Sequence, residues 1–149
     1  ELPKDTNQLL AQLLGTEYWG TSVLITLTIN KLPFEIFASH GYGSARTPGA
    51  RVAKRLRMRD SYLMANWYCM GHDNDKMVYP TEALKGRDYV KQYFSGTGSF
   101  QRAYNFDEPE GTYAEELLLP PSALGVVMCN IEIQKGEDGN ERLDYHVST

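Results

Sequence analysis

The sequence predicts one mixed α/β domain spanning residues 1–149, in which strands predominate. Several short segments are rich in β-branched and aromatic residues, as strands are. Two other segments carry the capping residues of helices, and polar, glycine-containing loops follow several of the predicted strands. Hydrophobic residues make up 42% of the chain, which is enough for a folded core and argues against disorder.

The first predicted element is a helix over residues 5–14. It begins with side chains that can cap it, carries an apolar stripe of leucines, and ends at Gly15. A strand rich in β-branched residues follows at 23–30, and a short turn leads to a second strand at 34–39. Because the turn between them is so short, we expect these two strands to form a hairpin.

The second predicted helix begins at Thr47, a typical N-cap residue, and has Pro48 at its first position. It is expected to continue to about residue 58. The remaining predicted strands are short and apolar or aromatic, and they cover residues 67–70, 89–94, 126–134 and 143–147. The last two are expected to pair as a hairpin through the glycine-containing turn at 136–140.

The composition limits the compartment and the partners. The net charge of −4 is modest and gives no overall reason to expect nucleic acid or an anionic membrane. Cys69 and Cys129 lack a second cysteine at metal-binding or redox-motif spacing, so we expect two reduced thiols in a cytoplasmic protein. No signal peptide and no bilayer-spanning apolar run is visible. The first residue is not methionine, which is compatible with a processed, tagged or truncated product.

Candidate chemistry centres on two of the three histidines. His40 comes directly after the predicted strand at 34–39, and His72 follows the strand at 67–70 with one glycine between. Two histidines at strand ends can converge on one metal ion through their imidazole nitrogens. Further oxygen donors follow His72 directly, at Asp73, Asn74 and Asp75. The alternative is that both histidines are ordinary hydrogen-bonded groups beside tight turns, and spacing alone favours this alternative.

The order and spacing of these motifs resemble the late motifs of calcineurin-like metallophosphoesterases of the bacterial and phage type. The resemblance begins with His40-Gly41 after one apolar strand and Gly71-His72-x-x-Asp75-Lys76 after another. Later segments that look like this family are Thr97-Gly98-Ser99-Phe100, Tyr104, Tyr113-Ala114-Glu115 and residues 120–125. The resemblance covers nearly the whole chain, as the portion that follows the family's central Gly-Asn-His motif.

That resemblance implies a sheet sandwich with flanking helices, of which this chain is the C-terminal half. It implies metal-dependent phosphoester hydrolysis in the complete domain, with two divalent ions (manganese, iron, zinc or nickel) as cofactors. His40 and His72 would be ligands of the same ion, and Asn74 falls where the family's last histidine would reach the other ion. An amide is a weaker ligand than an imidazole, so Asn74 departs from the family pattern.

The family's earlier Asp-x-His, Gly-Asp and Gly-Asn-His motifs are missing from this sequence. We therefore expect the chain alone to be weakly active or inactive. Its expected partners are a phosphoester substrate and either the missing N-terminal half or a second copy of the chain, with no membrane. The rival hypothesis is a non-catalytic binding or structural module that has lost the dinuclear metal centre.

A run of basic residues follows His40 and consists of Arg46, Arg51, Lys54, Arg55, Arg57 and Arg59. Arg46 lies in the loop after His40 and is the candidate substrate-binding residue. The others are interpreted as the solvated face of an amphipathic helix, whose buried side uses Val52, Leu56 and, less strongly, Ala53. A third and weaker hypothesis is a nucleic-acid-binding module that uses these basic residues.

Two further motifs are given structural interpretations. A thiol nucleophile at Cys69 with His72 as its base is rejected, because side chains three residues apart at a strand end point away from each other. Residues 97–99 are interpreted as a strand-end turn, because no lysine follows at the position that a phosphate-binding P-loop requires.

Overall fold

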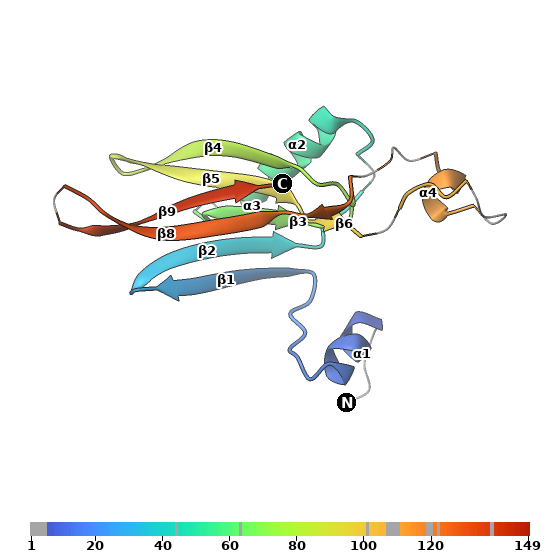
Figure 1. Cartoon of the computed structure of the whole chain (residues 1–149), viewed down its shortest axis with the longest axis horizontal. Coiled ribbons are helices and arrows are strands. Elements are labelled where there is room, and N and C mark those ends of the chain that lie inside the picture. Colours follow the sequence, from blue (N-terminus) through green and yellow to red (C-terminus); the bar gives the residue numbers. More distant parts are fainter. Residues whose placement is uncertain are drawn as a thin grey trace.

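The structure is a computed structural model that describes residues 6–43, 45–62, 64–100, 102–106, 111–118, 121, 123–137 and 139–149. These residues form a five-stranded mixed sheet, two two-stranded sheets and several short helices (Figure 1). The predicted fold class, a mixed α/β fold in which strands predominate, is therefore confirmed.

The main sheet has the strand order β1-β2-β3-β5-β4. Its strands are β1 (Ser22–Ile29), β2 (Leu32–Ser39), β3 (Trp67–Met70), β4 (Val78–Lys85) and β5 (Asp88–Gly96). β1 and β2 are antiparallel, as are β4 and β5, whereas the three central strands β2, β3 and β5 run parallel to one another. The carboxyl ends of these three strands therefore lie at one edge of the sheet.

The first hairpin forms as predicted. Asn30 and Lys31 connect β1 to β2 with φ values of 48° and 68°. Left-handed backbone at both central residues is the geometry of the two-residue turn that matches the twist of paired strands. The predicted strand at 67–70 is also confirmed as β3.

The sequence pattern missed strand β4, and it missed the first residue and the last two residues of β5. β4 contains Pro80, which lacks a backbone donor and argues against a central strand. The structure resolves this conflict because β4 is the outermost strand of the sheet, where one row of donors needs no partner strand.

Four short helices accompany the sheets in the described part of the chain: α1 (Thr6–Leu13), α2 (Pro48–Leu56), α3 (Met58–Ser61) and α4 (Tyr113–Glu116). Thr47 caps α2, since its hydroxyl accepts a hydrogen bond from the Ala50 amide at 3.4 Å, and Pro48 opens the helix as expected. α1 matches the first predicted helix, although Asp5 lies outside the described residues. The leucine stripe of α1 is exposed, and only Ala11 of this helix is buried.

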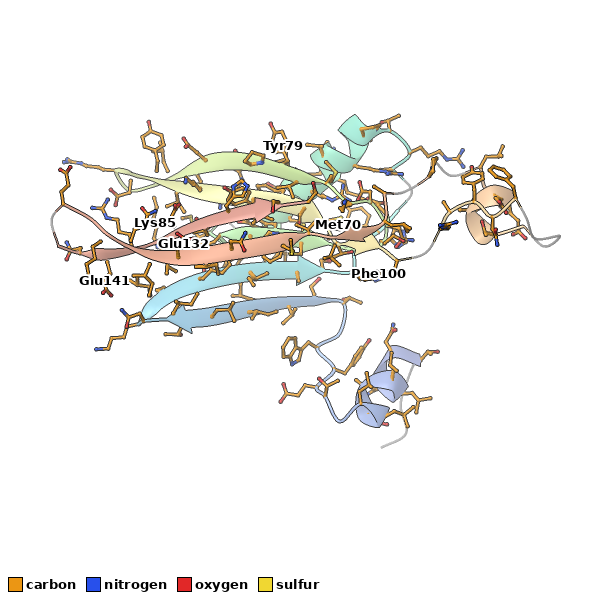
Figure 2. The ribbon with its side chains drawn as sticks, viewed as in Figure 1. Met70, Tyr79, Lys85, Phe100, Glu132 and Glu141 are labelled. Carbon is orange, nitrogen blue, oxygen red and sulfur yellow. The ribbon has the colours of Figure 1, made fainter. Side chains whose placement is uncertain are left out.

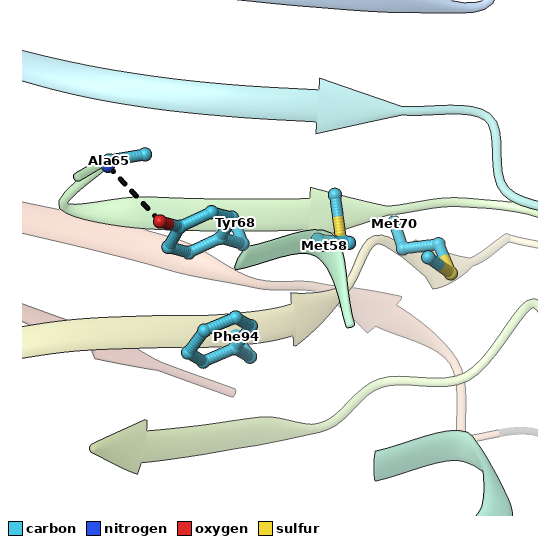
Figure 3. Packing of buried hydrophobic residues seen from close by; sticks show 5 residues of the cluster. All are labelled: Met58, Ala65, Tyr68, Met70 and Phe94. Carbon is cyan, nitrogen blue, oxygen red and sulfur yellow. Dashed lines mark hydrogen bonds between the residues drawn. The ribbon is translucent and has the colours of Figure 1, made fainter. Parts of the chain in front are cut away.

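One face of the main sheet is covered by α2 and α3. The buried cluster on this side contains Met58, Ala65, Tyr68, Met70 and Phe94 (Figure 3). The rings of Tyr68 and Phe94 stack with centroids 4.4 Å apart, and the Tyr68 hydroxyl accepts a hydrogen bond from the Ala65 amide at 3.2 Å. Tyr68 and Met70 share this face because side chains alternate along a strand.

The opposite face is covered by the hairpin of β8 (Met128–Lys135) and β9 (Glu141–Ser148) (Figure 1). Its core joins Phe34 and Tyr93 of the main sheet to Tyr145 and Val147 of β9. The predicted final hairpin is confirmed, and the Gly136 amide closes its turn by donating to the Asn140 carbonyl at 2.8 Å. The chain is thus layered, with helices, main sheet and hairpin in that order.

A small second hairpin-like sheet pairs β6 (Gly98–Ser99) with β7 (Gly125–Val126). The interpretation of residues 97–99 as a turn was therefore incomplete, because Gly98 and Ser99 are strand residues. Met70 and Phe100 lie at one end of the main sheet, whereas Lys85 and Glu141 lie at the other end (Figure 2). None of the described helices is long and apolar enough to cross a membrane.

Candidate functional site

The two candidate histidines leave the main sheet side by side. β2 ends at Ser39 and β3 ends at Met70, and these two residues are partners in the parallel register. The ladder continues for one step past the strands, because the Gly71 amide donates to the Ser39 carbonyl at 3.0 Å. His40 and His72 therefore emerge at the same edge of the sheet, which the sequence did not reveal because it does not state strand direction.

The two imidazoles are in direct contact. His40 Nε2 lies 3.3 Å from His72 Nδ1, and the ring centroids are 5.3 Å apart with the planes at 72°. Both residues are exposed. A separation of 3.3 Å suits a hydrogen bond between a protonated and an unprotonated ring nitrogen. It also suits two nitrogens bound to one tetrahedral ion, which lie about 3.3 Å apart when each is about 2.0–2.1 Å from the ion.

Glycines allow this close approach. Gly41 has a φ of 87°, and a Cβ there would lie 2.7 Å from Met70 Cγ. A Cβ at Gly71 would lie 3.2 Å from the His40 carbonyl oxygen. Alanine at Gly41 would thus be strained in its backbone and would overlap the buried Met70 side chain.

Asn74 is placed differently from the two histidines. Its side chain is exposed, and within the described residues it makes no hydrogen bond to either imidazole. Its backbone has a φ of 50°, a left-handed conformation that asparagine adopts more readily than most residues. The observed geometry therefore accounts for asparagine at this position through its backbone.

The carboxylates beside His72 are paired with cations of α2. Lys54 Nζ lies 2.6 Å from both carboxylate oxygens of Asp73. Arg55 pairs with Asp75 and, at 3.5 Å, with Asp73, while Arg51 lies 3.6 Å from Asp75. Burial raises the pKa of the Asp75 carboxyl, and Arg55 and Arg51 oppose that rise. Both carboxylates are therefore engaged by α2.

These contacts correct the interpretation of the basic helix. Lys54 and Arg55 were expected on a solvated face, but their exposed fractions are 8% and 1%. Ala53, which was expected on the buried side, is exposed. A hydropathy pattern assigns lysine and arginine to the outside because it cannot register the acidic partners that compensate them. Three of the basic residues that the nucleic-acid hypothesis uses, Arg51, Lys54 and Arg55, are paired with Asp73 and Asp75.

The residues present fit one part of a divalent-ion site. His40 and His72 offer two adjacent nitrogens, which suit zinc, nickel, iron or manganese. Among the described residues, no group of three histidine, cysteine, aspartate or glutamate side chains is arranged to hold an ion. A complete coordination shell would thus require donors from elsewhere.

An open pocket of about 490 Å³ lies beside His40. It is lined by Asn7, Tyr18, Gly20, Thr21, Ser22, Val23, Ala38, Ser39, His40, Cys69 and Thr97. Ser39, which the sequence did not single out, accepts hydrogen bonds from the Gly41 amide at 3.2 Å and from the Ser22 hydroxyl at 3.1 Å. Arg46 is exposed in the loop that follows His40.

The Cys69 thiol is an unsuitable nucleophile. Burial raises its pKa to about 12, and the Ser95 hydroxyl donates to its sulfur at 3.8 Å. Its side chain lies on the opposite face of β3 from that of Met70. Neither Cys69 nor Cys129 forms a disulfide.

Comparison with known proteins assigns no family to this chain. No protein-family model, no curated protein and no solved structure matches it.

Proposed function

We propose that this chain supplies two imidazole ligands to a divalent-metal centre whose function, in the complete domain, is the hydrolysis of phosphoesters. The observation that carries the proposal is the 3.3 Å separation of His40 Nε2 and His72 Nδ1 at the ends of two parallel strands. The proposed reaction, phosphoester hydrolysis, comes from the resemblance of these motifs to the late motifs of calcineurin-like metallophosphoesterases. The same resemblance leads us to propose that the fold is a metallophosphoesterase-type sheet sandwich.

The surroundings of the histidine pair suit an anionic substrate. Arg51, Lys54 and Arg55 face Asp73 and Asp75, which leaves a surplus of one positive charge next to the pair. Arg46 is exposed six residues after His40 and is the proposed contact for the substrate phosphate. When bound, the ions of such a centre stabilise the negative charge that develops on the phosphoryl group.

The proposal requires ligands beyond His40 and His72. They would come from a further segment of the same polypeptide or from a second copy of the chain. Asn74, an exposed residue, stays a proposed and weaker ligand of a second ion. We expect this chain alone to hydrolyse phosphoesters slowly or not at all.

The metal centre is tested by titrating the chain with Zn²⁺ and with Mn²⁺ in a calorimeter. Binding should be present in the original chain and absent in the His40→Ala, His72→Ala double variant. His146→Ala is the matched control, since it removes the third histidine, an exposed residue of β9, and should leave binding intact. Equal binding by the double variant would overturn the proposal.

The rival function is a non-catalytic binding or structural module that has lost the dinuclear metal centre. It is favoured because α2 engages Asp73 and Asp75, and because no group of three potential ligand side chains is arranged to hold an ion within the described residues. Inorganic phosphate distinguishes the two functions. Phosphate binding that requires both Zn²⁺ and Arg46 supports the hydrolase, whereas the absence of Zn²⁺-dependent phosphate binding supports the module.

A further inference from the structure

Lys54 connects the two loops that carry the histidines. Its ammonium group donates to the Tyr42 carbonyl at 3.0 Å, two residues after His40. The same group lies 2.6 Å from the carboxylate of Asp73, the residue after His72. Both partners of this ion pair are buried, so water screens their attraction only weakly.

Arg51 of α2 repeats this connection, whereas Arg55 contacts only the segment after His72. Arg51 Nε donates to the Ala45 carbonyl at 2.8 Å in the loop after His40, and its guanidinium lies 3.6 Å from Asp75. Arg55 pairs with Asp75 and also lies 3.0 Å from Met77 Sδ. One helix therefore holds both loops through side chains that are buried or nearly so.

The held carboxylates alternate with residues in a strained conformation. His72 has a φ of 67° and Asn74 has a φ of 50°, values that cost free energy for residues other than glycine. Asp73 follows the first strained residue and Asp75 follows the second. Such a backbone persists only where surrounding contacts hold it.

The end of β5 is shaped to admit these ion pairs. A Cβ at Gly96 would lie 2.9 Å from Arg55 Nη2 and would overlap the backbone carbonyl and the carboxylate of Asp75. The Gly98 amide also donates to the Asp75 carbonyl at 3.0 Å. The loop after His72 is therefore held on one side by α2 and on the other by the end of β5 and the first residue of β6.

We infer that Lys54 and Arg55 are positioning residues for the histidine pair. By holding Asp73 and Asp75 they keep His72 in its left-handed conformation, and through Tyr42 the same Lys54 holds the loop of His40. The two imidazoles then stay adjacent before any ligand arrives, which lowers the entropy cost of binding one ion. The role of this arrangement in metal binding rests on the proposed function. The arrangement itself, in which Lys54 and Arg55 hold the two histidine loops, does not depend on a metal.

The experiment replaces Lys54 with methionine in the full chain, which keeps the length of the side chain and removes its charge. Two quantities are measured: the nuclear Overhauser contact between the ring protons of His40 and His72 without metal, and the affinity for Zn²⁺. In the Lys54→Met variant the ring contact should disappear, and Zn²⁺ should bind about 10–100-fold more weakly.

A second variant distinguishes whether Lys54 positions the histidines or only stabilises the fold. Lys54→Met leaves the Asp73 carboxylate buried without its nearest cation, which lowers the melting temperature whatever the role of Lys54. The Lys54→Met, Asp73→Asn double variant removes that buried charge. Positioning predicts that the melting temperature recovers while the ring contact and the Zn²⁺ affinity do not.

Lys91→Met is the matched control. It removes the same charge from the exposed Lys91–Asp144 pair, whose side chains are 57% and 43% exposed, and it should change neither readout. An intact ring contact in folded Lys54→Met protein would overturn the inference, as would full recovery of both readouts in the double variant. Failure of the original chain to bind Zn²⁺ would instead overturn the proposed function, and the ring contact would still test positioning.

Discussion

Ser39 and Met70 are partners across the parallel strands β2 and β3, and the histidine pair follows from this register. His40 comes one residue after Ser39, and His72 comes two residues after Met70. The extra residue on the β3 side is Gly71, whose amide still bonds to the Ser39 carbonyl at 3.0 Å. The left-handed turn at His72 then directs its ring toward His40, with which it is in contact.

Alanine at Gly41 should disturb both stability and the histidine pair. The left-handed backbone and the overlap with Met70 together should lower the free energy of unfolding by about 2–4 kcal/mol. Gly43→Ala is the matched control, since Gly43 has a φ of 70° but no atom within 4 Å of an added Cβ. It should cost about 1 kcal/mol. Urea unfolding measures both variants, and equal costs would show that Met70 does not limit this position.

Substitutions of Asn74 separate its backbone role from a ligand role. Asn74→Gly should change the free energy of unfolding by less than about 1 kcal/mol, because glycine accepts a φ of 50°. Asn74→Ala should lower it by about 1 kcal/mol. If the amide is no ligand, Asn74→Gly binds Zn²⁺ as tightly as the original chain. A marked loss of Zn²⁺ affinity in this variant would instead support Asn74 as a ligand.

The Cys69 thiol should resist alkylation in the folded protein. With its pKa raised to about 12, about one thiol in 10⁴ is ionised at pH 8, compared with about a quarter for an unperturbed cysteine. Iodoacetamide labelling of a Cys129→Ser variant should therefore be slow and should accelerate with rising pH and on unfolding. Rapid labelling at pH 8 in the folded state would contradict the burial of this thiol.

Tyr145 ties the β8–β9 hairpin to the main sheet. Its hydroxyl accepts from the Asn66 side-chain amide at 2.9 Å and donates to the Lys91 carbonyl. Tyr145→Phe keeps the ring contact with Phe34 but leaves these polar groups without the hydroxyl. We expect a loss of about 1–3 kcal/mol in the free energy of unfolding, measured by urea titration. An unchanged midpoint would mean that water replaces the hydroxyl.

Glu115 should make the α4 segment sensitive to acid. Its carboxylate accepts from the Thr112 amide at 2.6 Å and from the Asn105 amide at 2.7 Å, and these bonds lower its pKa. A lowered pKa means that the stabilisation is present above the unfolded value, about 4.3, and is lost as the pH falls through the folded value. The protection factor of the Thr112 amide, which compares its exchange rate with the intrinsic rate at the same pH, should fall in acid, and Glu115→Gln should reduce that pH dependence.

Local sequence patterns correctly predicted the structural elements that depend only on neighbouring residues. The turn at Asn30-Lys31, the cap at Thr47 and the proline at the start of α2 depend on the preferences of a few adjacent residues, and all three form as expected. β4 could not be recognised in this way. Its Pro80 is acceptable only because β4 lies at the edge of the sheet, which is a property of the whole topology.

For the candidate site, too, some features could be predicted from the sequence and others only from the tertiary structure. The sequence by itself identified His40 and His72 as chemistry-bearing residues next to glycines at strand ends. Only the tertiary structure decided that the strands are parallel neighbours, that the imidazoles are in contact, and that Lys54 and Arg55 lie buried against Asp73 and Asp75. The physical reason is that strand direction and the compensation of buried charge depend on residues far apart in the chain, which no local pattern records.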